Sequence, residues 1–194
     1  MRSLWRKRRG KIDLLTGLYF MILMTALLAV QFQLVIFSNI SVFMEDALVA
    51  SNLASAIVDL REFGTTGIVC IASPDTAYEL YRESLRCNLS LDENWNSTNT
   101  EMIAGEVTIQ TYEIYDVIEN DVTIYSYGES GSHMKTIPEG LGSVKTPDGT
   151  LVESTSIYSR ISFPVKGIFG VEIEAVKQKT VDIIRMMNQE TGGI

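Results

Sequence analysis

Two cysteines and one histidine are the side chains in this sequence with the most obvious capacity for chemistry. Cys70 and Cys87 are its only cysteines, and such a pair serves either as a structural disulfide or as two buried thiols. His133 is the only histidine, and it lies in a glycine-rich stretch with no identified Cys, Asp or Ser partner for catalysis. We therefore interpret His133 as a surface residue.

A second candidate for chemistry is an oxygen-rich segment with the alternate spacing of the first ligands in a calcium loop, formed by Asp92, Asn94 and Asn96. The rest of that motif is missing, since Ser97 stands where a glycine makes the sharp turn and Ile103 where a bidentate glutamate belongs. Motifs of serine hydrolases, zinc proteases, dithiol enzymes and phosphate-binding loops are also missing from the sequence. We expect no metal site, no cofactor and no enzymatic activity.

Charge is distributed very unevenly along the chain of 194 residues. Six of the 16 basic residues precede Asp13, which leaves 10 for the rest of the chain against 24 acidic residues. An acidic body would repel nucleic-acid phosphates, so nucleic acid is not an expected partner. A basic tip and an acidic body instead indicate two segments in different compartments.

An uncharged apolar run follows the basic tip. No charged residue occurs from Leu14 to Phe37, and about 20 apolar residues in a helix cross a bilayer core of about 30 Å. A cleavable secretory signal has a shorter apolar core and a small-residue cleavage site, which this run lacks. We predict a basic cytoplasmic leader over residues 1–13 and a transmembrane helix over residues 14–37. Because basic residues stay in the cytoplasm, the C-terminal domain is expected outside it, with the lipid bilayer as a partner.

Helical spacing continues beyond the span, over residues 38–64. One face of this amphipathic extension is apolar and carries Val49, Leu53, Ile57 and Leu60. The glycines of the segment Gly64–Gly67 are expected to end the helix. The apolar face needs a cover, and we predict that it packs on a β-sheet of the extracytoplasmic domain, residues 65–194.

The first part of that domain is expected to contain a helix. Ser73 has the character of an N-cap and Pro74 that of a first-turn residue, which predicts a helix to about Arg86. Outside the cytoplasm, a disulfide between Cys70 and Cys87 would tie this helix to the segment before it and contribute roughly a few kcal/mol. The alternative is two buried thiols, and the compartment favours the disulfide.

Strand-like alternation replaces helical spacing after a polar loop over residues 88–100. Four segments are rich in Val, Ile, Thr and Tyr or alternate apolar with polar residues: 106–117, 122–127, 157–165 and 171–175. Glu119-Asn120 and Gly167–Gly170 suit tight hairpins, whereas residues 128–149 form a longer connection. The run 180–189 is either a last helix or an extension of the final strand. The predicted fold class is α+β, a long N-terminal helix packed on a small antiparallel sheet.

The order of these features resembles that of the type IV pilin-like proteins, and most closely that of the TadE-like pseudopilins of tight-adherence systems. The resemblance is carried by Arg8-Arg9-Gly10, Asp13 and the span Leu14–Phe37, while the body from Ile68 to Gln189 matches only in layout. It implies a pilin-like fold and a structural role, as a minor pilin or pseudopilin in a surface pilus or secretion filament. Its implied partners are other pilin-like subunits, the assembly machinery and a prepilin peptidase.

The resemblance also implies a processing site and an assembly residue. A prepilin peptidase would cut after Gly10 and leave Lys11 as the new N-terminus. Proteins of this group usually carry a glutamate at the fifth position after the cut, where this chain has Leu15, and its acid, Asp13, stands at the third. Asp13 would help to position the new amino terminus against neighbouring subunits. A second interpretation of Asp13 needs no assembly, since a carboxylate at a helix start is favourable to the helix dipole.

Two further classes of function stay open. A single-pass membrane protein whose extracytoplasmic domain binds a partner would have much the same sequence. An extracytoplasmic enzyme would require a cleft with convergent polar groups.

Overall fold

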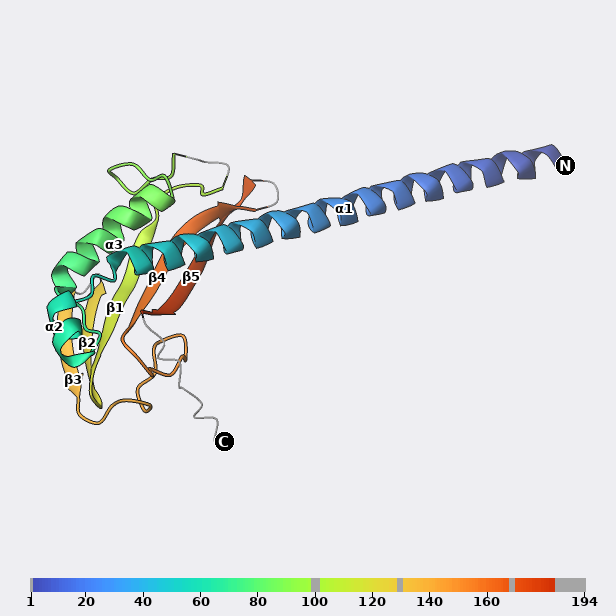
Figure 1. Cartoon of the computed structure of the whole chain (residues 1–194). Coiled ribbons are helices and arrows are strands. Elements are labelled where there is room, and N and C mark those ends of the chain that lie inside the picture. The colour runs from blue at the N-terminus through green and yellow to red at the C-terminus, as the bar shows by residue number, and fades with distance from the viewer. Residues whose placement is uncertain (1, 99–101, 129–130, 168–169, 184–194) are drawn as a thin grey trace, which may run out of the picture.

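A small α+β domain at one end of a very long helix is the architecture of this chain (Figure 1). The computed structural model describes residues 2–98, 102–128, 131–167 and 170–183, with the backbone alone for residues 2–12. The helices within these ranges are α1 (Arg2–Ser55), α2 (Leu60–Thr66) and α3 (Pro74–Asn88). The strands are β1 (Thr108–Ile118), β2 (Asp121–Gly128), β3 (Gly131–Ile137), β4 (Ser156–Lys166) and β5 (Glu172–Asp182).

Helix α1 joins the predicted span to the domain without interruption. It has 54 residues and is therefore about 80 Å long at about 1.5 Å per residue. Its N-terminal half projects away from the domain, and its C-terminal part lies along the sheet (Figure 1). The domain is consequently carried on a single rigid element.

The predicted extension over residues 38–64 contains the end of α1, a short connection and the first five residues of α2, Leu60–Gly64. After Ser55 the chain turns, and Val58 forms an isolated antiparallel bridge with Ile71. Asp59 then caps α2 by accepting the backbone N–H groups of two residues in its first turn. Gly67, with a φ of 74°, ends α2 in the left-handed conformation that glycine adopts readily.

Helix α3 begins and ends close to where the sequence predicts. The Ser73 side chain accepts the N–H of Thr76, and Pro74 occupies the first turn, where its missing N–H costs nothing. The buried residues of the helix are Ala77, Tyr81 and Leu85, at the spacing of a single face. The prediction of a helix from Pro74 to about Arg86 is confirmed.

The sheet is antiparallel throughout, with the strand order β3-β2-β1-β4-β5. The four predicted strands are present, and the turn Glu119-Asn120 joins β1 to β2, with Glu119 at a φ of 57°. The fifth strand, β3, falls where the sequence predicts a long connection, so that prediction is wrong for residues 131–137. Strand β5 extends to Asp182, which favours the strand alternative there, while residues 184–189 lie outside the described part of the chain.

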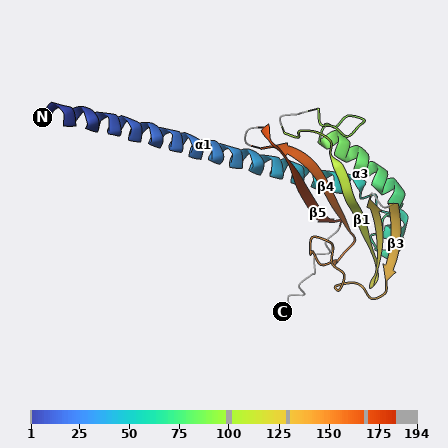
Figure 2. The ribbon, with the colours of Figure 1, turned by 180° about the vertical axis from the view of Figure 1, so that it is seen from behind.

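Helices α1 and α3 cover one face of the sheet, as the front and back views show together (Figures 1 and 2). The main core lies between these helices and the sheet, and it includes Met44, Leu48, Tyr81, Tyr112 and Ile157. On the opposite face the connection 138–155 covers a smaller cluster formed by Tyr115, Val122, Val152 and Tyr158. The prediction of an α+β fold with the N-terminal helix against the sheet is confirmed.

The face that α1 presents to the domain differs from the predicted one. Leu53 is 50% exposed, Ile57 38% and Leu60 78%, and Val49 alone is half-buried, so the prediction is wrong for three of the four residues of the stripe. The buried face is instead formed by Ile40, Met44, Ala47, Leu48, Ser51, Asn52 and Ser55. Because α1 ends at Ser55, a helical wheel drawn through residue 60 places Ile57 and Leu60 on a helix face that does not exist.

Small polar side chains on the buried face let α1 approach its neighbours closely. The Asn88 amide of α3 donates to Ser51 Oγ at 3.0 Å, and the Tyr112 hydroxyl of β1 donates to Ser55 Oγ at 2.9 Å. A buried polar group lowers the stability of the fold unless it is hydrogen-bonded, as these groups are. These two hydrogen bonds therefore hold α1 against both α3 and the sheet.

Candidate functional site

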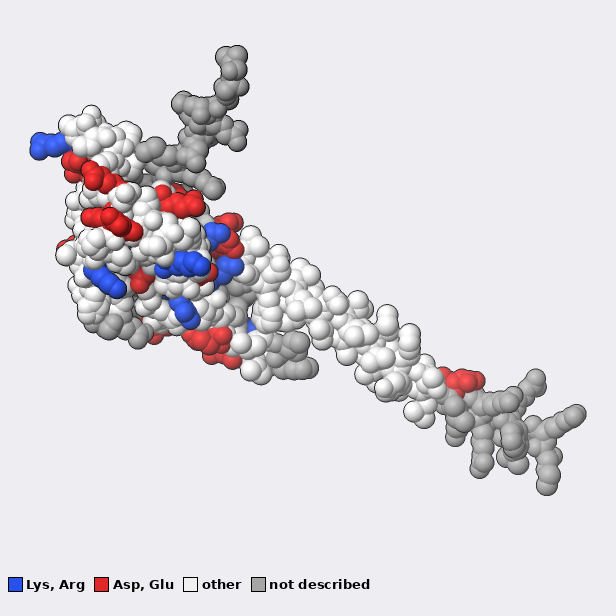
Figure 3. Space-filling model, turned by 90° about the horizontal axis from the view of Figure 1, so that it is seen from below, with Lys and Arg blue, Asp and Glu red and all other residues white. Residues whose placement is uncertain are grey.

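The outstanding functional feature is the uncovered apolar half of α1. Of the helices in the described residues, α1 alone is long and apolar enough to cross a membrane, and none of its most apolar window is buried by the domain. Figure 3 shows this stretch as an uncharged rod beside a domain that carries acidic and basic side chains. The exposed large side chains include Leu14, Leu18, Phe20, Ile22, Leu23, Leu27, Leu28, Phe32 and Val35.

A helix that is apolar on all sides is stable only in an apolar environment. In water, the uncovered half of α1 would expose a continuous hydrophobic surface far larger than an ordinary soluble protein tolerates. The arrangement can therefore insert into a bilayer or pack among other helices. The finding agrees with a membrane-anchored protein, and α1 by itself leaves the direction of insertion open.

The predicted processing and assembly residues lie together near the start of α1. Gly10 and Lys11 are part of the helix backbone, within the segment whose side chains are not described. Asp13 follows them and is exposed. One helical turn rises about 5.4 Å, so the three positions lie within about one turn of each other. The structure places them at the end of the molecule that is farthest from the domain (Figure 1).

The uncovered half of α1 ends where the β4–β5 hairpin reaches the helix. Gln33 Nε2 donates to the backbone carbonyl of Lys166 at 3.1 Å. The predicted span, residues 14–37, therefore has its last four residues beside the domain, and Ile36 and Phe37 pack partly against the core. Gln33 is the first residue of α1 for which the structure records such a tie.

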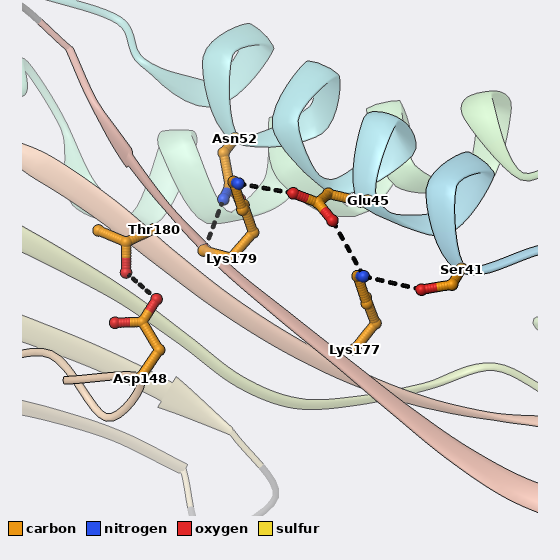
Figure 4. Close-up of polar contacts among 7 residues, drawn as sticks. All are labelled: Ser41, Glu45, Asn52, Asp148, Lys177, Lys179 and Thr180. Carbon is orange, nitrogen blue, oxygen red and sulfur yellow. Dashed lines mark hydrogen bonds and ion pairs between the residues drawn. The ribbon is translucent and has the colours of Figure 1, made fainter. Parts of the chain in front are cut away.

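An ion-pair cluster holds α1 on the edge strand β5 (Figure 4). Glu45 accepts from Lys179 Nζ at 2.6 Å and from Lys177 Nζ at 3.0 Å, and Lys177 also donates to Ser41 Oγ at 2.9 Å. Hydrogen bonds and charge attraction from the two lysines lower the pKa of Glu45 to about 2. Glu45 is thus ionised at neutral pH and bridges two residues of β5.

Asn52 adds a backbone contact one to two turns further along. Its Nδ2 donates to the carbonyl of Lys179 at 3.2 Å, so α1 partly covers the edge of the sheet. Covering an edge strand in this way protects it from pairing with another chain. Sequence reasoning missed this junction because Glu45 and Lys179 are more than 130 positions apart. A weak signal was present in the spacing of Ser41, Glu45, Ser51, Asn52 and Ser55 along one side of the helix.

A polar groove lies beside this junction, with a volume of about 700 Å³. Its walls are formed by Glu45, Pro147, Asp148, Arg160, Val176, Lys177, Gln178 and Lys179. Asp148 is held by Thr180, whose Oγ1 donates to its Oδ2 at 2.6 Å (Figure 4). The lining offers charge and amide groups for binding, and it lacks a serine, cysteine or histidine that would act as a nucleophile or general base.

The two cysteines do not form the predicted disulfide, and both are free. Cys70 precedes α3, where its carbonyl accepts the N–H of Asp59, whereas Cys87 is exposed near the last residue of α3. At about 1.5 Å per residue, the helix from Pro74 to Cys87 separates its ends by about 20 Å. A disulfide requires Cα atoms within about 7 Å, so the helix that it was expected to staple keeps the thiols apart.

Asp116 is a buried carboxyl on β1, and it is 6% exposed. Burial raises its pKa from 3.8 to about 6, while hydrogen bonds from the Ile71 N–H and Thr155 oppose that shift. The pKa of the nearby Cys70 thiol is also raised, chiefly by burial and then by the Asp116 charge. A thiol with a raised pKa is a poor nucleophile, so this pair does not form a reactive cysteine site.

The remaining candidates from the sequence lie apart from the junction. His133 is exposed on β3 rather than on a loop. In the calcium-like segment, Asp92 Oδ1 accepts the backbone N–H groups of Asn94 and Asn96, which makes a local turn. Within the described residues, no three His, Cys, Asp or Glu side chains gather at a spacing that would hold a metal ion.

No family model, no curated protein and no solved structure matches this chain. The α1 helix and its packing on the domain are therefore the features of the molecule that bear on its function.

Proposed function

We propose that this chain is a structural subunit of a surface pilus or secretion filament, a pilin-like protein that resembles the TadE-like pseudopilins. One observation carries the proposal. A single helix, α1, is uncovered and largely apolar from Leu14 to Val35 and packed into a small α+β domain from Ile40 to Ser55. In a subunit of this shape, the uncovered part of α1 can first lie in a bilayer and later pack against the helices of neighbouring subunits instead of lipid.

The order of charges at the helix start supports the same proposal. The basic tip belongs in the cytoplasm and the domain outside it, which places the domain where a filament would grow. Removing the leader after Gly10 takes away five of the six basic residues that precede Asp13. Each charge left on the helix would cost at least about 2.5–3.5 kcal/mol on crossing the hydrocarbon. Cleavage would therefore allow α1 to leave the membrane, with Asp13 near the new amino terminus.

A membrane-anchored binding domain is the second candidate, and the groove beside β5 favours it. The Arg160 Nε atom is buried and has no hydrogen-bond partner among the described residues. An unpaired donor in the wall of a polar groove is suited to an acidic group of a ligand. This function would need the same anchor but neither processing nor assembly.

Processing by a prepilin peptidase separates the two candidates. The full chain is expressed in a host with an active prepilin peptidase, and its intact mass is measured. We expect a mature chain that begins at Lys11, and we expect Gly10→Leu to block the cut. Gly17→Leu is the matched control, because a Cβ at Gly17 meets nothing within 4 Å and cleavage should persist. Wild-type chain that stays uncut beside a correctly processed pilin would reject the filament subunit.

A further inference from the structure

The end of the β4–β5 hairpin lies at the level of Gln33 on α1, where the uncovered part of the helix stops, four residues before the end of the predicted span. The hydrogen bond from Gln33 to the Lys166 carbonyl ties the two elements at that level. The start of β5 lies at the same level as Lys166, because Lys166 is opposite Glu172 and the N–H of Gly167 donates to the Val171 carbonyl at 2.7 Å. Figure 1 shows the end of the hairpin beside α1, on the side nearer the projecting half of the helix.

The length of α1 fixes the depth of this level in a membrane. From Leu14 to Gln33 the helix rises about 28 Å at about 1.5 Å per residue. The hydrocarbon core of a bilayer is about 30 Å thick. When α1 spans the bilayer with Leu14 at one boundary of the hydrocarbon, Gln33 and the hairpin residues tied to it lie near the other boundary, at the headgroups.

The hairpin presents apolar side chains at this boundary. Val171 is 61% exposed and Ile173 48%, although Phe163 and Val165, on the same side of the neighbouring strand, are 3% and 5% exposed. On this apolar face the inner strand β4 is therefore covered as far as Val165, whereas on the edge strand β5 exposure rises from Ala175 through Ile173 to Val171. A Cβ at Gly167 would lie 2.9 Å from Ile173 Cδ1, so Gly167 packs closely against this exposed side chain.

We propose that Val171 and Ile173, at the described start of the second hairpin strand, form a second membrane contact and enter the interfacial layer beside α1. The inference rests on the membrane anchoring in the proposed function. Together, the transmembrane helix and the hairpin contact would set the distance of the domain from the bilayer and restrain its tilt relative to the membrane. One helix alone would leave the domain free to rotate on the surface.

Charge indicates which lipid surface fits. Glu172 and Glu174 are exposed and alternate with the two apolar residues, so they point to the opposite face of β5. The exposed Lys166 lies opposite Glu172 and offsets one of the two carboxylates, so the remaining net negative charge near the surface would be repelled by anionic headgroups. The contact should therefore be stronger on zwitterionic phosphatidylcholine than on phosphatidylserine, and it should depend on apolar insertion rather than on salt.

Depth-dependent quenching tests this contact in the full chain. In a background with Cys70→Ser and Cys87→Ser, an environment-sensitive fluorophore is attached to Val171→Cys and the protein is reconstituted in phosphatidylcholine vesicles with brominated lipids. We expect a blue-shifted, quenched label at position 171. Val176→Cys is the matched control, because Val176 is 46% exposed on the same strand but on the other face, and its label should stay in water.

A third label, on Leu23→Cys, separates failure of this inference from failure of the anchor. Quenching at 23 with equal, water-like signals at 171 and 176 would overturn the hairpin contact and leave the anchor intact. Loss of quenching at 23 would overturn both. A blue shift at position 171 that disappears when the chain is diluted in excess lipid would also overturn the hairpin contact. In that case a second copy of the chain, and not lipid, would cover Val171.

Discussion

The two halves of α1 form one continuous helix, yet they meet different surroundings. Residues 14–35 are exposed almost without exception, whereas from Ile40 to Ser55 one side of the helix is buried against α3 and the sheet. The first half is apolar on all sides, and the second carries small polar residues on its buried side. An all-round apolar surface therefore identifies the part of α1 that leaves the domain, whereas the packed part has one buried side on which apolar residues such as Met44 and Leu48 are combined with small polar ones such as Ser51 and Ser55.

The largest expected effect is a loss of folding stability, and it should differ between two leucines of the packed half. Leu48 is fully buried and Leu53 is 50% exposed. Leu48→Ala should reduce the free energy of unfolding by about 2–5 kcal/mol, because it leaves a cavity between α1 and the sheet. Leu53→Ala should change it by about 0.5 kcal/mol or less. Urea unfolding of the full chain in detergent micelles measures both, and equal losses would contradict the observed packing face.

A charged residue in the uncovered half should weaken the insertion of α1 into the membrane and leave the fold of the domain unchanged. Leu23→Arg is expected to cost about 2.5–3.5 kcal/mol of insertion, since an arginine would lie near the centre of the bilayer. Alkaline extraction of membranes should release this variant and retain Leu53→Arg, whose side chain faces water. Release of both variants, or of neither, would break the distinction between the two halves.

A buried carboxyl of the domain provides a pH signal that does not involve α1. The pKa of Asp116 is raised to about 6, so between about pH 6 and pH 4 the folded chain binds a proton that the unfolded chain does not. This group should therefore add about 1–2 kcal/mol of stability as the pH falls from 7.5 to 4. Asp116→Asn should remove that increment in urea unfolding at the two pH values. An unchanged increment in the variant would assign it to another group.

The smallest effect concerns the bridge between α1 and β5. The pKa of Glu45 is lowered from 4.5 to about 2, so its contribution is complete above pH 4.5 and is lost as the pH falls towards 2. Because these side chains are partly exposed, we expect Glu45→Gln to cost only about 0.5–1 kcal/mol at pH 7. The loss should vanish near pH 2, and Asp46→Gln, at an exposed neighbour, should show no such loss. A loss that persists at pH 2 would be a packing effect.

Local signals in the sequence predicted a large part of the fold. Ser73 and Pro74 mark the start of α3, and Glu119-Asn120 marks the β1–β2 turn, because caps and turns depend on neighbouring residues. Strand β3 was not predicted because it lies exposed at the sheet edge and most of its residues are glycine or polar, so it lacks the alternation that burial imposes. The apolar span was predicted for the opposite reason, since its composition alone decides its environment.

The junction and the state of the cysteines could not be predicted in the same way. The bridge from Glu45 to Lys177 and Lys179 joins residues that only the folded topology brings together. Cys70 and Cys87 have a suitable separation in sequence, but a straight helix lies between them and keeps them apart. Both cases depend on three-dimensional distance, which spacing along the chain does not contain.

The most direct test of the filament proposal is the location and N-terminus of the chain in its native host. Filaments are sheared from the cell surface, and the chain in the sheared and membrane fractions is analysed by N-terminal sequencing. We predict a chain that begins at Lys11 in the sheared fraction, with its uncovered helix half now among other subunits. A chain that begins at Met1 and stays entirely in the membrane fraction, while filaments are present, would contradict the proposal and favour the anchored binding domain.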